Sequence, residues 1–132
     1  MRKKTSAALL LALLTAMALT ACASSPQAGE QDPRDIKVDL RTDPAPARAG
    51  EPTKLTAVVE GLLDEKNTIV QLEIRRPDHS GLPELIEEVE YEGDGLYSAP
   101  YAFNDGMTYD VYVHIYKGEL HVTKKRPVEV EP

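Results

Sequence analysis

Cysteine is nearly absent from this sequence, which has one in 132 residues. One cysteine excludes an internal disulfide, so a folded domain of this chain must be held together by its apolar core. The sequence also lacks a Gly-rich phosphate loop and a zinc-protease motif. Nothing in it assembles a nucleophile, a base and stabilising donors, so an enzyme is not expected.

Basic charge is also scarce. The chain has 15 basic and 22 acidic residues, and three of the basic ones, Arg2, Lys3 and Lys4, stand at the N-terminus. Without these three, 12 basic residues stand against 22 acidic ones, a balance of −10. Affinity for nucleic acid comes mainly from Lys and Arg at phosphates, so nucleic acid is not an expected partner.

The apolar run at residues 7–19 is too short to span a membrane, because a spanning helix needs roughly 20 residues. The basic residues before it and the small residues after it are typical of an export signal, which we expect at residues 1–21. The next residue completes Leu19-Thr20-Ala21-Cys22, which resembles the lipobox of bacterial lipoproteins. In that motif the cysteine sulfur receives diacylglycerol. Ordinary signal cleavage, with Cys22 left as a free thiol, is the alternative interpretation.

Residues 22–35 are small, polar and Pro-containing, and we expect them to form a lipidated N-terminus and a flexible linker. A diacylated Cys22 would stay in the lipid bilayer, because two acyl chains bind stably where one binds only marginally. The expected location is the extracytoplasmic face of the cell membrane. Whether the envelope has one membrane or two stays open.

Residues 36–132 suit one small domain. Apolar and polar residues alternate there in short runs, with turn-forming residues between them. We predict about seven strands, near residues 36–42, 53–60, 68–76, 85–92, 96–103, 108–116 and 119–130. The pattern predicts an all-β, immunoglobulin-like β-sandwich, with Tyr109 as the candidate for its tyrosine corner.

The predicted strand at 85–92 is acidic on one face, where Glu88, Glu90 and Glu92 alternate with Val89 and Tyr91. We interpret this as a solvated edge face, where like charges also discourage aggregation. A calcium site is the alternative, but calcium usually takes converging ligands from a loop.

Two histidines stand in the last predicted hairpin. With Lys117-Gly118 as its two-residue turn, His114 lies directly opposite His121, and both point outward. Imidazoles suit Cu(II) or Zn(II), so the pair is a candidate metal site, with Asp64 or Glu65 as a candidate third ligand. Two solvated surface histidines are the alternative interpretation.

The third histidine belongs to Asp78-His79-Ser80, which contains the three residue types of a catalytic triad. Triads arise where distant residues converge beside an oxyanion hole, not from three neighbours. We therefore interpret this tripeptide as a turn.

Three stretches together resemble the YtkA-like domain family, which is related to FixH-type proteins. They are Gly-Asp-Gly-Leu-Tyr at 93–97, Gly-Met-Thr-Tyr at 106–109, and Val113-His114 with His121 seven residues on. The resemblance covers roughly residues 36–131. It implies a small immunoglobulin-like domain on a bacterial lipoprotein. Because FixH-type relatives are linked to assembly of haem–copper oxidases, it also implies copper handling.

The chain departs from this family after the second histidine, where Val-Met-Pro is typical and Val122-Thr123-Lys124 stands here. The missing thioether disfavours Cu(I) and leaves Cu(II) or Zn(II) as the expected ions. The first functional hypothesis is therefore a membrane-anchored module that holds a transition metal through the histidine pair. The second is a metal-free module that recognises another protein of the cell envelope, since this fold serves many binding functions.

Overall fold

A computed structural model of the chain describes residues 30–132. The predicted signal peptide (1–21), Cys22 and most of the predicted linker lie outside these residues. A compact unit runs from Gln31 to Pro132. It contains every strand and every buried apolar residue of the described part, so this segment holds a complete core and is expected to fold independently.

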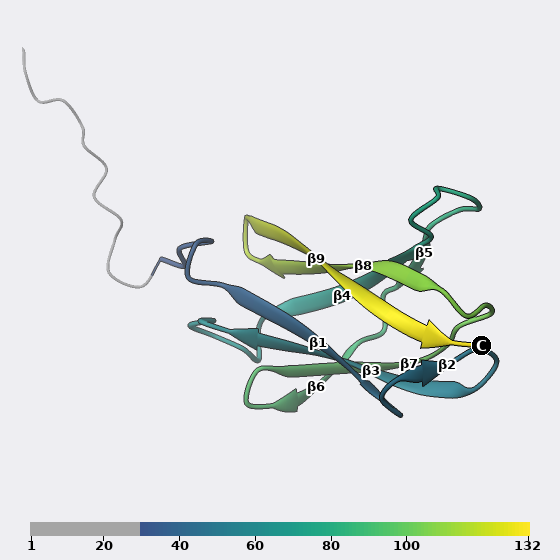
Figure 1. Cartoon of the computed structure of the whole chain (residues 1–132). Coiled ribbons are helices and arrows are strands. Elements are labelled where there is room, and N and C mark those ends of the chain that lie inside the picture. The colour runs from purple at the N-terminus through teal and green to yellow at the C-terminus, as the bar shows by residue number, and fades with distance from the viewer. Residues whose placement is uncertain (1–29) are drawn as a thin grey trace, which may run out of the picture. The chain divides into compact units, whose positions relative to one another are not determined.

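The strands form two facing sheets (Figure 1). One sheet has the order β1 (Lys37–Asp43), β3 (Pro52–Glu60), β7 (Leu96–Ala102) and β6 (Glu90–Gly93). The other has the order β2 (Ala47–Arg48), β9 (Leu120–Glu131), β8 (Thr108–Lys117), β4 (Ile69–Arg75) and β5 (Glu84–Ile86). Residues 30–132 contain no helix, and so none long and apolar enough to cross a membrane. The predicted β-sandwich is confirmed, and the two strand orders match the sheets of an immunoglobulin domain.

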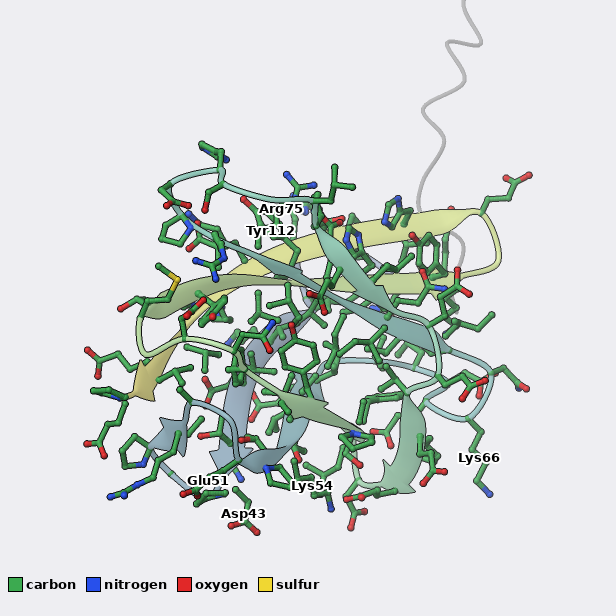
Figure 2. All side chains as sticks on the ribbon, turned by 90° about the vertical axis from the view of Figure 1, so that its right-hand side faces the viewer. Asp43, Glu51, Lys54, Lys66, Arg75 and Tyr112 are labelled. Carbon is green, nitrogen blue, oxygen red and sulfur yellow. The ribbon has the colours of Figure 1, made fainter. Side chains whose placement is uncertain are left out.

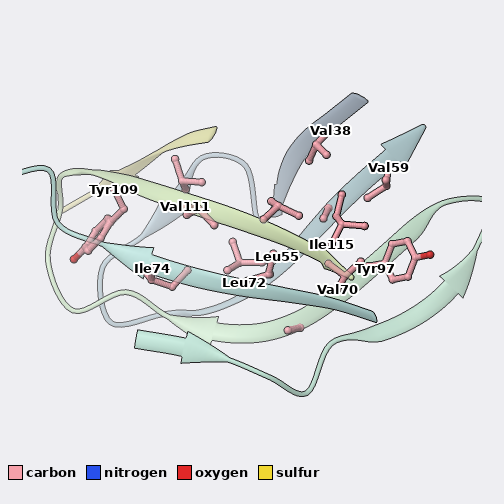
Figure 3. Close-up of a cluster of buried hydrophobic side chains, with 14 of the residues drawn as sticks. Val38, Leu55, Val59, Val70, Leu72, Ile74, Tyr97, Tyr109, Val111 and Ile115 are labelled. Atoms are coloured by element: carbon pink, nitrogen blue, oxygen red, sulfur yellow. The ribbon is translucent and has the colours of Figure 1, made fainter. Parts of the chain in front are cut away.

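The core lies between the sheets because alternate residues of each long strand point inward (Figure 3). On β3 the buried residues are Leu55, Ala57 and Val59. On β4 and β8 they are Val70, Leu72, Ile74, Tyr109, Val111, Val113 and Ile115. The residues between them point outward, so the alternation that builds the core also determines which side chains remain for binding.

The single strand predicted at residues 85–92 is wrong, because the structure has two short strands there in different sheets. β5 pairs with β4, whereas β6 pairs with β7. Ile86 and Tyr91 both pack against the core. They are five positions apart, so one continuous strand would point them to opposite faces. The chain instead crosses from one sheet to the other between them.

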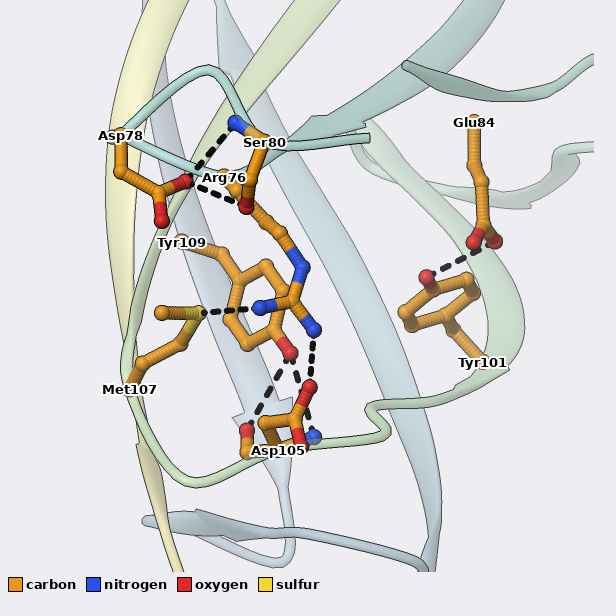
Figure 4. A network of polar contacts seen from close by, with 8 residues as sticks. All are labelled: Arg76, Asp78, Ser80, Glu84, Tyr101, Asp105, Met107 and Tyr109. Carbon is orange, nitrogen blue, oxygen red and sulfur yellow. Dashed lines mark hydrogen bonds and ion pairs between the residues drawn. The ribbon is translucent and has the colours of Figure 1, made fainter. Parts of the chain in front are cut away.

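Tyr109 forms the predicted tyrosine corner. Its hydroxyl donates to the Asp105 carbonyl oxygen and accepts from the Asp105 amide, both at 3.2 Å (Figure 4). Arg76, which follows β4, forms an ion pair with the Asp105 carboxylate and lies 3.6 Å from the sulfur of Met107. These contacts hold the loop between β7 and β8 against the end of β4.

The Asp78-His79-Ser80 tripeptide forms the predicted turn. The Asp78 carboxylate accepts hydrogen bonds from the Ser80 amide at 2.9 Å and from the Ser80 hydroxyl at 2.7 Å (Figure 4). His79 adopts a φ of 57°. The serine hydroxyl therefore donates within the turn, as expected for a short polar loop.

Candidate functional site

The two predicted histidines lie on the outer face of the five-stranded sheet, in the part formed by β4, β8 and β9. Figure 2 shows Arg75 and Tyr112 on this face, on the opposite side of the molecule from Asp43 and Lys54. We call it the histidine face. Its outward side chains around the histidines are Ile69, Gln71, Glu73 and Arg75 on β4, Asp110, Tyr112, His114 and Tyr116 on β8, and His121, Thr123 and Lys125 on β9. Thr108 on β8 and Pro127, Glu129 and Glu131 on β9 also point outward, farther along these strands.

The predicted register of the last hairpin is wrong. His114 pairs with Thr123 and not with His121. The loop consists of Gly118 and Glu119, one residue later than predicted, and Gly118 has a φ of 57°. This places glycine at the first central position, as in a type II′ turn. Because the shift moves the partner by two residues, both histidines stay on the same face, in diagonal positions.

Three polar atoms converge where β8 meets β9. His114 Nδ1 lies 3.3 Å from His121 Nε2 and 3.1 Å from Thr123 Oγ1. Thr123 Oγ1 lies 3.3 Å from His121 Nε2, which closes a nearly equilateral triangle. Ligands about 2.0–2.1 Å from a tetrahedral ion stand about 3.3–3.4 Å apart. The spacing of the triangle therefore matches that of three ligands on one ion.

Glu73 determines which nitrogen of His114 belongs to the triangle. Its Oε2 lies 3.0 Å from His114 Nε2, and the side chains of Glu73 and His114 are only 13% and 16% exposed. An ionised carboxylate only accepts hydrogen bonds, so Nε2 carries the proton and donates it. The lone pair of the neutral ring is then on Nδ1. Carboxylates fix the tautomer of metal-binding histidines in the same way.

Aromatic and charged neighbours hold these groups in place. The Arg75 guanidinium forms an ion pair with Glu73. The hydrogen bond from Arg75 lowers the pKa of the Glu73 carboxyl, burial raises it, and the hydrogen bond from His114 lowers it further. The net effect holds the pKa of Glu73 below its usual range. Arg75 also lies over the Tyr112 ring, 4.8 Å from its centroid. Next to the triangle, Tyr116 stacks on His121 with ring centroids 4.2 Å apart and planes 13° from parallel.

The structure does not bring Asp64 or Glu65 to the histidines. The Glu65 carboxylate accepts hydrogen bonds from the Tyr91 hydroxyl at 2.6 Å and the Gly95 amide at 2.9 Å. The Asp64 carboxylate accepts one from the Asn67 side chain at 2.7 Å. Among residues 30–132, no three His, Cys, Asp or Glu side chains form a group that could hold a metal ion. Thr123, a residue of another type, is therefore the candidate third ligand.

Thr123 and Glu73 complete the site, and the sequence predicts their positions to different degrees. Thr123 has the outward parity of His121, so the strand pattern already places it on the same face. Glu73 also alternates outward on its strand, but 41 residues separate it from His114. Only the pairing of β4 with β8 brings the two together.

The outer face of the four-stranded sheet carries an open groove of about 680 Å³. Glu88, Glu90 and Glu92, the residues of the predicted acidic face, line part of it. Glu92 forms an ion pair with Lys54 at 2.6 Å and accepts a hydrogen bond from the Ser98 hydroxyl at 2.6 Å. In the described part of the chain these glutamates form no group that could hold a metal ion. The groove shares no residue with the histidine face.

Comparison with known proteins does not assign the chain to a family. No family model matches the sequence, and no curated protein is significantly similar to it. The resemblance to the YtkA-like domain therefore stays a prediction, and the candidate site rests on the geometry of the histidine face.

Proposed function

We propose that this chain is a membrane-anchored, extracytoplasmic binding module that holds Cu(II) or Zn(II) through His114 and His121. The triangle of two imidazole nitrogens and the Thr123 hydroxyl is the observation that supports this most. His121 and Thr123 are exposed, so an ion can reach the site from solvent. Two imidazoles and a weakly binding hydroxyl leave coordination positions for water or for another molecule.

The donor set suits divalent copper or zinc better than Cu(I). Imidazole binds copper and zinc well, whereas Cu(I) is selected by thiolates and thioethers. The Met107 sulfur contacts Arg76 instead of the histidines. Thr123 stands where the YtkA-like family typically has a methionine. The resemblance to the YtkA-like family implies copper handling. For this chain we therefore propose Cu(II), not Cu(I), as the copper ion that is bound.

The N-terminal sequence supports the anchoring part of the proposal. Leu19-Thr20-Ala21-Cys22 has the spacing of a lipobox, and a short basic segment and an apolar run precede it. Lipid attachment at Cys22 would hold the sandwich at the extracytoplasmic surface of the membrane. This is where a protein that takes up or delivers extracytoplasmic metal would act.

Calorimetric titration of residues 30–132 with Cu(II) and Zn(II) tests the metal site. We expect binding to the native segment and its loss in the His114→Ala/His121→Ala double variant. His79→Ala is the matched control, because His79 is the third histidine and lies in a turn outside the histidine face. Uptake that persists in the double variant, or that depends on His79, would contradict the proposal.

Glu73→Ala is expected to weaken metal binding about 10- to 100-fold, the usual cost of removing a carboxylate that orients a histidine ligand. Without Glu73, the proton can occupy either nitrogen of His114, and only one tautomer offers Nδ1 to the ion. Gln71→Ala is the control, because Gln71 pairs with His114 across the strands and makes no side-chain hydrogen bond to it. Nitrogen-15 chemical shifts of the metal-free segment would report the tautomer directly. Equal affinities of the two variants would contradict this role of Glu73.

Metal-free recognition of an envelope protein is the second candidate function. Leu82 and Leu85, before and within the edge strand β5, are 92% and 49% exposed. Exposed apolar residues at a sheet edge favour pairing with another chain. If residues 30–132 take up neither ion in the titration, this candidate becomes the better one.

A further inference from the structure

We infer that the histidine faces of two copies of this chain bind one metal ion between them, so that metal uptake joins two domains through β4, β8 and β9. His114 and His121 of each copy would supply four imidazoles to a shared ion, and these would replace the weakly binding Thr123 hydroxyls as its ligands. This inference rests on the proposed metal binding and adds the partner that completes the site.

The first argument is the incomplete set of ligands. Structural zinc sites usually have four protein ligands. The described part of the chain offers two imidazoles and one hydroxyl, and no further His, Cys, Asp or Glu joins them. The ligands project from the surface of a sheet instead of lining a cavity. A site with four protein ligands therefore needs donors from outside this domain.

The second argument is the charge of the histidine face. Residues 30–132 contain 12 basic and 22 acidic residues, so most surfaces of two copies repel each other. Around the two histidines the four charged side chains neutralise one another. Glu73 forms an ion pair with Arg75, and Asp110 forms one with Lys125 at 3.4 Å. Two such faces can therefore meet at the histidines without bringing unpaired charges together there, while Glu129 lies farther along β9.

The third argument is the apolar surface beside the ligands. Ile69 is 60% exposed and pairs with Tyr116, whose ring stacks on His121. A second copy placed over the histidines would cover Ile69. A contact with twofold symmetry brings the same patch of both copies together, so each histidine pair meets its equivalent at the axis. The apolar area is small, and the ion is therefore needed for association.

Sedimentation velocity of residues 30–132, without metal and with Zn(II), tests the inference. We expect a monomer without zinc and a doubled mass with zinc, at one ion per two chains. His121→Ala is expected to stay monomeric in zinc. Ile69→Asp is expected to keep metal uptake while lowering the fraction of dimer, and Leu82→Asp, an exposed leucine outside the histidine face, should dimerise like the native segment.

The possible results separate this inference from the proposed function. A monomer that binds one zinc ion per chain would overturn the dimer and leave the metal site intact. A zinc-dependent dimer that persists in His121→Ala, or that is lost in His79→Ala, would overturn the histidine bridge. Absence of zinc uptake in the calorimetric titration would overturn the zinc-bridged dimer, and absence of both zinc and copper uptake would overturn the proposed function as well.

Discussion

Gly95→Ala is expected to destabilise the domain by about 3 kcal/mol or more, in the upper range for a single substitution. Gly95 has a φ of +73°, and a Cβ there would lie 2.2 Å from the carbonyl oxygen of Val59. The Gly95 carbonyl also accepts a hydrogen bond from the Val59 amide at 2.8 Å. The added methyl group therefore pushes β3 away from a backbone contact that the glycine itself makes.

Gly93→Ala is the matched control for this prediction. Gly93 also has a positive φ, +102°, but a Cβ there would meet nothing within 4 Å. This variant carries the conformational strain without the clash, and a residue in such a backbone region costs about 1–3 kcal/mol. Chemical denaturation of both variants measures how much more unfolding free energy Gly95→Ala loses than Gly93→Ala. Equal losses would show that strain alone, and not the approach to Val59, sets the cost at Gly95.

Leu72→Ala is expected to cost about 2–5 kcal/mol of unfolding free energy, the range for removing a buried leucine side chain. Leu72 is fully buried on β4, between two outward residues of the histidine face, Gln71 and Glu73. The substitution leaves a cavity at the centre of the sandwich. Since no disulfide limits unfolding, this loss should appear in full in the midpoint of urea denaturation.

Leu82→Ala provides the same chemical change at an exposed position. Leu82 is 92% exposed, so its truncation should change stability by no more than about 0.5 kcal/mol. Comparable losses in the two leucine variants would mean that β4 does not pack as described. Such a result would also contradict the position of Glu73 beside His114, because Glu73 lies on the same strand.

The sequence predicted the fold well where strands are long and half-buried. β3, β4, β8 and β9 each alternate over seven residues or more, and their predicted limits lie within two residues of the observed ones. Short elements were missed. β2 has two residues, too few for any periodicity, and the split between β5 and β6 shows only as a change of parity between Ile86 and Tyr91.

The candidate site was predicted in part. Parity placed His114, His121 and Thr123 on one outward face, and the structure brings their polar atoms together. The direct opposition of the histidines was wrong, because it depended on the position of one glycine in the turn. Asp64 and Glu65 stand in the loop expected near the hairpin, but their carboxylates accept hydrogen bonds from Asn67, Tyr91 and Gly95, which no local pattern in the sequence indicates.

Local properties of the chain were determined by the sequence alone: the net charge, the absence of a disulfide, and the inward or outward parity of each long strand. Parity depends only on the two-residue period of a strand. The predicted parity of His114 and His121 was therefore correct although the predicted register of their hairpin was wrong. The tertiary structure decided the contacts between distant segments. Glu73 meets His114 because β4 pairs with β8, and Arg75 and Tyr112 hold that carboxylate in place. Such pairings depend on how the strands are ordered in the sheets, which no local pattern specifies.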